Sequence, residues 1–301
     1  IIRKYLSYYE KNGFIQVLKK IILKPSRLIN KKIAYKKLDR TKKEIFFRKS
    51  LKERFSYIYS SHYWPSKESV SGPGSEIENT KNIRKEILKL IDKYKIKKFL
   101  DIPCGDFNWI KNIVNKNFEY TGGDIVPNLI NTNKEKFTQS NIKFIEINLI
   151  EDKLPYADLM LCRDCLIHFS NNNIEKFFNN FIKSEINYIL ITSYELNFEK
   201  KILEYNYDIN DGDFRPIFLM EKPFNLPQPL IKILDKDVEH KNKTKLKCYL
   251  YLYSKNQLKS LIENMAGVDG SASGSGGAGV DGSATGSGGA GVGGSATGSG
   301  S

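Results

Sequence analysis

Residues 99–109 read FLDIPCGDFNW, a short apolar run that ends in Asp101 and is followed by a single glycine, Gly105. A dinucleotide-binding loop needs three glycines at set positions, but Pro103 and Asn108 occupy the flanking positions here. No GKS or GKT triplet follows, so the stretch is not a phosphate-binding P-loop either. One glycine allows one close backbone approach, which suits a nucleoside ligand without a phosphate chain.

Helical and strand patterns alternate on both sides of this stretch. We expect helices at 76–94, with Ser75 as its cap, and at 107–115, 127–137 and 173–184, and strands at 98–102, 120–125, 142–147, 157–162, 188–193 and 247–253. This alternation favours a parallel sheet covered on both faces. The strand at 247–253 comes after a long excursion and is expected to enter antiparallel, at or near an edge. The predicted fold is therefore a Rossmann-like, doubly wound α/β fold with a mostly parallel sheet.

Polar residues stand where the predicted strands end, and ligands of open α/β sheets bind outside the carboxyl ends of the strands. Asp124 follows Asp101 by 23 residues, the spacing at which a carboxylate binds a ribose diol. Asn148 follows the third strand, where an amide can meet an adenine edge. Each residue alone is commonly a cap or turn residue, but together and in this order they indicate a nucleoside pocket.

Further stretches complete a pattern: Trp64, SGPGS at 71–75, Thr80, Arg84, LDIPCGDFNW at 100–109, YTGGDI at 120–125, RDCLIH at 163–168 and NYDINDGDFRPIFL at 206–219. With these motifs, residues 69–253 resemble class I S-adenosylmethionine (SAM)-dependent methyltransferases. The resemblance is narrower still to a bacterial subgroup that is often associated with surface-polysaccharide genes.

The resemblance implies SAM as cofactor and a set of residues that bind it: Asp101, Cys104, Gly105, Asp106, Asp124, Ile125, Asn148, Leu149 and Arg163. Asp101 would face the ammonium of the cofactor, and Asp124 would accept from both ribose hydroxyls. The chain departs from the family where Pro103 and Phe107 replace the two outer glycines of the first loop. Asn148 also stands where the family usually has an acid.

The RDCLIH stretch follows the predicted fourth strand and supplies candidate catalytic residues. A hydroxyl acceptor must lose its proton, and a histidine suits that role. We expect His168 to be the general base, with Asp164 as its orienting partner or as a base itself. A helix cap or a polar core position is the alternative for His168. Cys162 and Cys165 also form a CxxC, but no second CxxC exists, so no metal site is expected.

A long insert at 195–246 carries Asp213 and Arg215, which could bind a polar or anionic substrate or form a surface ion pair. Trp64 and the 71–75 loop could contact substrate and cover the cofactor, or be an ordinary loop with a cap. The predicted enzyme O-methylates a sugar hydroxyl of a surface polysaccharide or its precursor. The alternatives are a nucleic-acid or other small-molecule methyltransferase, and a non-catalytic cofactor-binding partner protein.

Charge is distributed unevenly along the 301 residues. Residues 1–60 hold 18 Lys and Arg against 4 Asp and Glu, whereas the remainder holds 30 of each. A neutral body disfavours nucleic acid as a partner. The basic segment contains predicted helices at 14–22 and 40–59, which could lie on an anionic membrane surface, bind a partner enzyme, bind nucleic acid or dock on the body.

Three segments are therefore predicted: a basic helical arm at 1–60, a methyltransferase domain at 61–264 and a Gly/Ser-rich linker or appended tail at 265–301. The tail repeats a twelve-residue pattern three times from Ala266 and cannot bury a core. No apolar run reaches the roughly 18 residues that a membrane-spanning helix needs. Four cysteines are too few for a disulfide scaffold, so we expect a cytoplasmic protein, with peripheral attachment to the inner membrane surface left open.

Overall fold

The structure, a computed structural model, describes residues 39–196, 205–240 and 244–259. The strands are β1 (Lys98–Asp101), β2 (Glu119–Asp124), β3 (Ile142–Glu146), β4 (Leu159–Cys162), β5 (Tyr188–Leu196), β6 (Ile231–His240) and β7 (Thr244–Ser254). The helices are α2 (Leu51–Ser60), α3 (Lys81–Lys93), α4 (Pro127–Phe137) and α5 (Asn171–Lys183), with short 3-10 turns η1 (Pro73–Ser75), η2 (Glu78–Thr80), η3 (Ile110–Asn112) and η4 (Leu166–His168). The predicted helix at 14–22 and the repeat tail lie outside the described residues.

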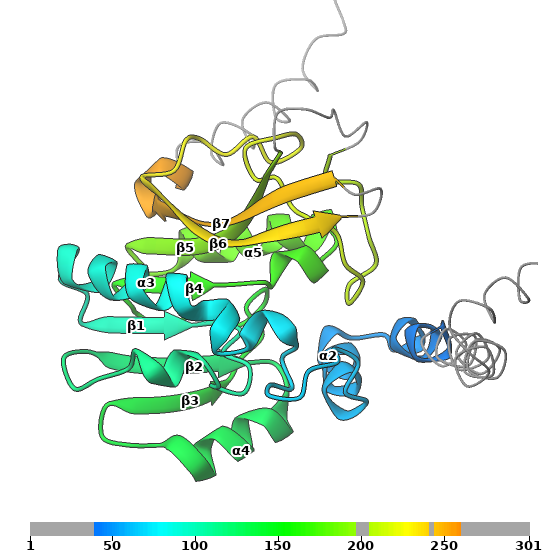
Figure 1. Ribbon diagram of the computed structural model, residues 1–301, viewed down its shortest axis with the longest axis horizontal. Helices are drawn as coiled ribbons and strands as arrows, with labels where there is room; N and C mark the ends of the chain where they lie inside the picture. Colours follow the sequence, from blue (N-terminus) through cyan, green and yellow to red (C-terminus); the bar gives the residue numbers. More distant parts are fainter. Residues whose placement is uncertain (1–38, 197–204, 241–243, 260–301) are drawn as a thin grey trace, which may run out of the picture. The chain divides into compact units, whose positions relative to one another are not determined.

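The strands form one sheet in the order β3-β2-β1-β4-β5-β7-β6 (Figure 1). Strands β3, β2, β1, β4 and β5 pair in parallel, and β7 runs antiparallel to both β5 and β6. The chain winds outward in one direction from β1 and in the other from β4, so the topological switch point lies between these two strands. This confirms the predicted doubly wound sheet with an antiparallel late strand.

Both faces of the sheet are buried, which explains why its strands read as short apolar runs. Phe99 on β1 packs in the cluster that α3 covers, whereas its neighbour Leu100 packs in the cluster that α5 covers. The same alternation continues on β4 through Met160 and Leu161. The two helical layers hold the central strands rigidly, and this fixes the position of the loops at their carboxyl ends.

Two predicted helices of the body differ from the structure, and one strand was not predicted. Within residues 107–115 the only helical turn is η3. Phe107 has a positive φ of 59°, which is not a helical conformation, so the predicted helix cannot begin there. The helix expected at 76–94 starts only at Lys81, and Ser75 does not cap it. Before it, the hydroxyl of Thr80 donates to the Glu76 and Ile77 carbonyls. Strand β6 was missed inside the insert, since charged residues interrupt its apolar alternation.

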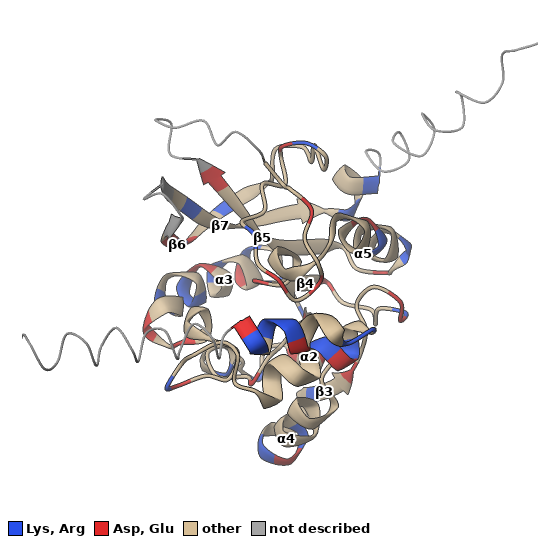
Figure 2. Ribbon diagram, turned by 90° about the vertical axis from the view of Figure 1, so that its right-hand side faces the viewer, with Lys and Arg blue, Asp and Glu red and all other residues tan. Residues whose placement is uncertain are grey.

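The described part of the predicted arm packs on the body. Residues 39–47 are helical, and a capping box at Ser50 and Glu53 starts α2 after a short break. Ile45 and Ile58 are each 1% exposed. Basic and acidic side chains are mixed along α2 (Figure 2), and Lys52 pairs with Glu146 of the body. Within the described residues, no helix has both the length and the apolarity needed to cross a bilayer.

Candidate active site

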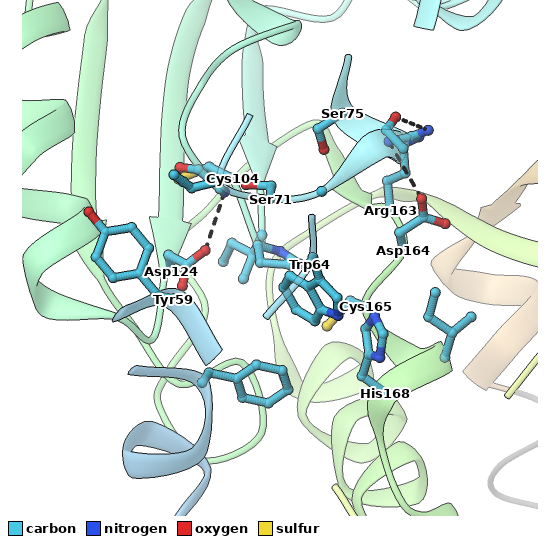
Figure 3. Close-up of a pocket in the computed structure, with 18 of the residues that line it drawn as sticks. Tyr59, Trp64, Ser71, Ser75, Cys104, Asp124, Arg163, Asp164, Cys165 and His168 are labelled. Atoms are coloured by element: carbon cyan, nitrogen blue, oxygen red, sulfur yellow. Dashed lines mark hydrogen bonds and ion pairs between the residues drawn. The ribbon is translucent and has the colours of Figure 1, made fainter. Parts of the chain in front are cut away.

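A cavity of about 740 Å³ opens at the carboxyl ends of the parallel strands, beside the switch point between β1 and β4. Most of the site residues predicted from the sequence line it: Trp64, Asp101, Cys104, Gly105, Asp124, Ile125, Asn148, Leu149, Arg163, Asp164 and His168. Figure 3 shows Asp124 and His168 on opposite sides of this space, with Trp64 between them. Asp106, Asp213 and Arg215 are not among the residues that line it.

Two buried carboxylates face one half of the cavity. Asp101 is 3% exposed and accepts a hydrogen bond of 2.8 Å from the Tyr120 hydroxyl, while Asp124 is 6% exposed and accepts from the Gly105 and Val126 amides. Burial raises the pKa of Asp101 to about 7 and that of Asp124 to about 6. Neither forms a salt bridge with any residue that the structure describes, so this half of the cavity fits a ligand that carries positive charge.

Gly105 is required for close packing of the loop after β1. Its φ is +55°, and a Cβ there would lie 2.2 Å from the Ser71 hydroxyl. Its carbonyl accepts a 2.8 Å hydrogen bond from the buried side chain of Asn133 on α4. The close neighbour of this glycine is therefore the 71–75 loop rather than the ligand, and its amide holds the Asp124 carboxylate.

The two unusual residues of this loop have clear structural positions. Asp106 turns away from the cavity, and its carboxylate accepts hydrogen bonds from the Ser69 and Ser71 hydroxyls and the Val70 amide. This corrects the expectation of a cofactor contact, because the side chain is occupied in anchoring the 71–75 loop. The ring of Phe107 is buried against Tyr120 and other aromatic rings of the core, so no side chain enters the cavity where a glycine is usual.

The far wall of this half is largely apolar, with Ile125 and Leu149 among its lining residues. Asn148 also lines it, but its side chain is engaged in its own turn. Its amide nitrogen donates to Glu151 at 2.9 Å, and its amide oxygen accepts from the Ile150 backbone at 3.1 Å. The flat, apolar surroundings suit an aromatic base, while the polar side chain mainly shapes the turn.

Arg163, Asp164 and Lys236 line the other half of the cavity, and with the buried Asp235 they form a cluster of four paired charges. Arg163 forms a two-point hydrogen bond with Asp235, at 2.9 and 3.0 Å, and also donates to the Gly74 carbonyl of the 71–75 loop. Lys236 donates to Asp164 at 2.6 Å. Burial opposes ionisation of Asp164, but the nearby Lys236 and Arg163 charges outweigh it and hold its pKa well below the usual range. The two carboxylates are thus already matched by two cations.

A β-bulge makes this cluster. The pairing of β6 with β7 shifts between Leu234 and Lys236, which leaves Asp235 as the extra residue. A bulge re-aims side chains, so that Asp235 and Lys236, although consecutive, both reach the same charge cluster. Sequence reasoning missed both residues together with β6. Among described residues, Asp164, Asp235 and Cys248 are the group whose ligand atoms could share a metal ion, so Cys162, Cys165 and His168 form no such group.

His168 lies at the end of η4 and lines the same half of the cavity. Its Nδ1 is 2.7 Å from the Asp213 carbonyl oxygen, and its ring lies 4.9 Å from the Trp64 ring and 6.0 Å from that of Phe214. Burial lowers its pKa, so the ring is neutral at neutral pH. The expected orienting contact from Asp164 is absent, because that carboxylate points toward Arg163 (Figure 3).

Asp213 and Arg215 were expected to bind substrate, but the structure places them behind His168. The Asp213 carboxylate pairs with Lys42 of the arm at 2.8 Å. Arg215 is 0% exposed and donates to Leu166 and Asn171. Sequence reasoning missed an aromatic wall of the cavity, to which the arm contributes Phe55 and Tyr59 and the segment after it contributes Tyr63. The helical spacing of apolar residues in the arm predicted that one of its faces is buried. It did not indicate which surface of the body that face would cover.

No protein-family model matches the chain, and the comparison with curated proteins finds no match. Among solved structures, the methyltransferase domain of bacterial CtHen1 is 11% identical at a TM-score of 0.39, covering 57% of this chain and 99% of that one. TehB from Haemophilus influenzae is 15% identical at 0.39, over 56% and 60%. Human N-acetylserotonin methyltransferase, solved with SAM, is 14% identical at 0.41, over 72% and 66%. Because these scores are low, the fold assignment depends on this chain's own strand order.

Proposed function

We propose that this protein is a SAM-dependent methyltransferase, and that its acceptor is a sugar hydroxyl on a surface polysaccharide or one of its precursors. One observation carries the proposal: Asp101, Gly105, Asp124 and Asn148, which come from three different strand ends, line a single cavity at the switch point. Ligands of doubly wound sheets bind at this place.

The residues of the cofactor half fit SAM in charge and in hydrogen bonding. Burying a carboxylate without a counter-charge is costly, and neither Asp101 nor Asp124, both buried, forms an ion pair with a described residue. The ammonium of the methionine part would supply that charge to Asp101. Asp124, held by the Gly105 and Val126 amides, would accept from the ribose hydroxyls. The apolar surface of Ile125 and Leu149 would cover the adenine.

The bound cofactor supplies a methyl group activated by its sulfonium, and the protein must then position and deprotonate the acceptor. His168 suits the second task. A carbonyl can only accept a hydrogen bond, so the 2.7 Å contact with Asp213 places the proton on Nδ1 and leaves a lone pair on Nε2. Nε2 is therefore the atom that would take the hydroxyl proton. Asp164 is a poor base here, because two cations hold its pKa low.

In the acceptor half, the aromatic side chains, rather than the charged ones, favour a sugar as the substrate. Trp64 and Phe214 flank His168, and Tyr63 also lines this part of the cavity. Aromatic faces offer flat apolar contact to the C–H faces of a sugar ring, and the tyrosine hydroxyl can hydrogen-bond. The resemblance of the RDCLIH and NYDINDGDFRPIFL stretches to the surface-polysaccharide subgroup points to the same class of acceptor.

Calorimetry with S-adenosylhomocysteine tests the cofactor part of the proposal. We expect the wild type to bind and Asp124→Ala to bind at least about tenfold more weakly, since hydrogen bonds to a charged group contribute about 1.5–3 kcal/mol each. Glu119→Ala is the matched control, because Glu119 is exposed at the opposite end of the same strand. Equal binding by wild type and Asp124→Ala would show that the ribose does not lie at Asp124.

Transfer of labelled methyl from SAM tests the acceptor. The panel contains free sugars, nucleotide sugars, oligosaccharides and a transfer RNA, each with wild type and with His168→Ala. We expect label on a sugar acceptor that is lost in the variant. Label on the RNA alone would replace the sugar proposal with the nucleic-acid alternative. Cofactor binding with equal label in both proteins would remove His168 from the reaction.

A further inference from the structure

We propose that Arg215 is a positioning residue for His168: it holds the turn that carries the histidine, so that the ring presents one fixed tautomer to the cavity. The inference rests on the proposed function, because that function makes His168 the base. It gives a role to the NYDINDGDFRPIFL stretch at 206–219. Of this stretch, only Phe214 lines the cavity.

One segment of the insert binds three successive carbonyls of η4. The Arg215 guanidinium donates to Leu166 at 3.2 Å, the Arg215 backbone amide donates to Ile167 at 3.0 Å, and the Gly212 amide donates to His168 at 2.8 Å. A 3-10 turn of three residues has few hydrogen bonds of its own. The turn is therefore held from outside, by a segment more than forty residues away in the chain.

The arginine side chain spans both ends of this turn. Its Nη1 reaches Leu166 before His168, and its Nη2 reaches the Asn171 amide oxygen after it at 2.6 Å. The side chain is fully buried, its Nε has no hydrogen-bond partner, and none of its hydrogen bonds within the described residues goes to a carboxylate. Burying a cation in this way is costly. A rigid fork with two separated donors is what arginine offers and lysine does not.

The same segment also sets the proton on the histidine. The Asp213 carbonyl, which accepts from His168 Nδ1, lies two residues before Arg215. Asp213 is held in turn by the hydrogen bond that its backbone amide donates to the Asn210 carbonyl and by its ion pair with Lys42. Fixing Arg215 against η4 thus fixes the distance between the ring and this carbonyl. Release of the turn would free the ring to adopt the Nε2–H tautomer that imidazole favours in water, and this form has no lone pair at Nε2.

Nitrogen-15 NMR of labelled histidine in the full chain tests the inference, and the chain has only three histidines to assign. We expect the wild type to show His168 as the Nδ1–H tautomer. Arg215→Lys should shift His168 mainly to Nε2–H while it keeps its affinity for S-adenosylhomocysteine. Methyl transfer to a sugar acceptor found with the panel should fall about 10²-fold, the cost of a misplaced catalytic group.

Two variants make the test independent of folding. Asn171→Ala removes one partner of the guanidinium and keeps the arginine, and it should produce the same tautomer shift to a smaller extent. Arg84→Lys is the matched control, since Arg84 also donates to a backbone carbonyl, that of Ile77, and has a buried Nε without a partner. The control should leave the His168 spectrum unchanged.

An unchanged His168 tautomer in a folded Arg215→Lys protein would overturn the inference and leave Arg215 as a packing residue. If Arg215→Lys does not fold, an unchanged spectrum in Asn171→Ala would overturn it equally. Failure of the proposed function would be seen in a different experiment. Wild-type protein that does not bind S-adenosylhomocysteine would contradict the function, and the NMR result on the His168 tautomer would remain valid.

Discussion

The two halves of the cavity manage charge in opposite ways. The cofactor half holds Asp101 and Asp124, two buried carboxylates that lack an ion-pair partner among the described residues. The acceptor half is lined by Arg163, Asp164 and Lys236, and Asp235 is buried behind them; Arg163 pairs with Asp235 and Lys236 with Asp164, while the exposed Asp237 also lines this part of the cavity. One half therefore has an unsatisfied preference for a cation, while the buried charges of the other half are already paired before any ligand arrives.

The halves also differ in how the chain builds them. The cofactor half comes from turns that directly follow β1 and β2, and backbone amides of these turns hold Asp124. The acceptor half joins residues far apart in sequence, because β6 supplies the partners of Arg163 and the insert supplies those of His168. The comparison indicates that charge would select the cofactor, whereas shape and aromatic surface would select the acceptor.

The largest effect is expected in the acceptor half, from His168→Asn. Asparagine is uncharged and cannot take the hydroxyl proton, so methyl transfer should fall by about 10²–10⁴-fold. Binding of S-adenosylhomocysteine should stay within about twofold, since His168 lies on the opposite side of the cavity from Asp124. Comparing initial rates with calorimetry separates the two. Equal loss of binding and rate would show that the halves are not independent.

The pH dependence of binding should report the cofactor half. Burial raises the pKa of Asp101 to about 7, and a bound ammonium favours the ionised carboxylate. Below that pH a proton must leave before the cation binds, so affinity should fall by up to about tenfold per pH unit as the pH drops through 7 and 6. Calorimetry at pH 6.5 in two buffers with different ionisation heats should reveal proton release, and Asp101→Asn should reduce it to the part that Asp124, with a pKa of about 6, contributes.

A smaller effect is expected on the stability of the unliganded protein. The pKa of Asp101 in the folded chain is above its ordinary value of 3.8, so the folded state retains a proton that the unfolded state has lost. Unfolding free energy should therefore decline as the pH rises from about 4 to 7, and no further above it, through this group. Denaturant titrations at pH 5 and pH 8 should show a weaker decline for Asp101→Asn. An identical pH response in both proteins would place Asp101 in water.

The smallest expected effect is at the arm. Lys42→Ala breaks the pair with Asp213, and partly exposed ion pairs contribute about 0–1 kcal/mol. The His168 tautomer should shift only slightly, because Arg215 and Gly212 still hold the turn. Lys43→Ala is the control, as Lys43 pairs with Asp39 inside the arm. A large tautomer shift in Lys42→Ala would show that the arm, rather than the insert, positions His168.

The cofactor half could be predicted from the sequence because its elements are local. A carboxylate at a strand end stays at that strand end, so Asp101 and Asp124 meet once the strands are parallel neighbours. The same reasoning failed for Asp106, where the peptide turns at the positive φ of Phe107 and the side chain faces the 71–75 loop. One dihedral angle of this kind leaves no periodic pattern in the sequence.

The acceptor half could be predicted only in part. His168 was identified from its residue type and its position after a strand, but its partner was not, because a backbone carbonyl has no signature in sequence. Asp235 and Lys236 were missed because a β-bulge reverses the alternation that marks a strand. Arg215 was expected at the substrate, since a cation on a polar loop is usually exposed, and only the fold shows it buried under η4.

A crystal structure of the protein with S-adenosylhomocysteine would show directly which residues hold each part of the cofactor. We expect the ligand to lie in this cavity with its ribose hydroxyls on Asp124 and its ammonium toward Asp101, and with its sulfur facing the side that carries His168. A ligand bound elsewhere, or in this cavity with its ribose turned toward Lys236, would contradict the division of the cavity into a charge-selecting half and a shape-selecting half.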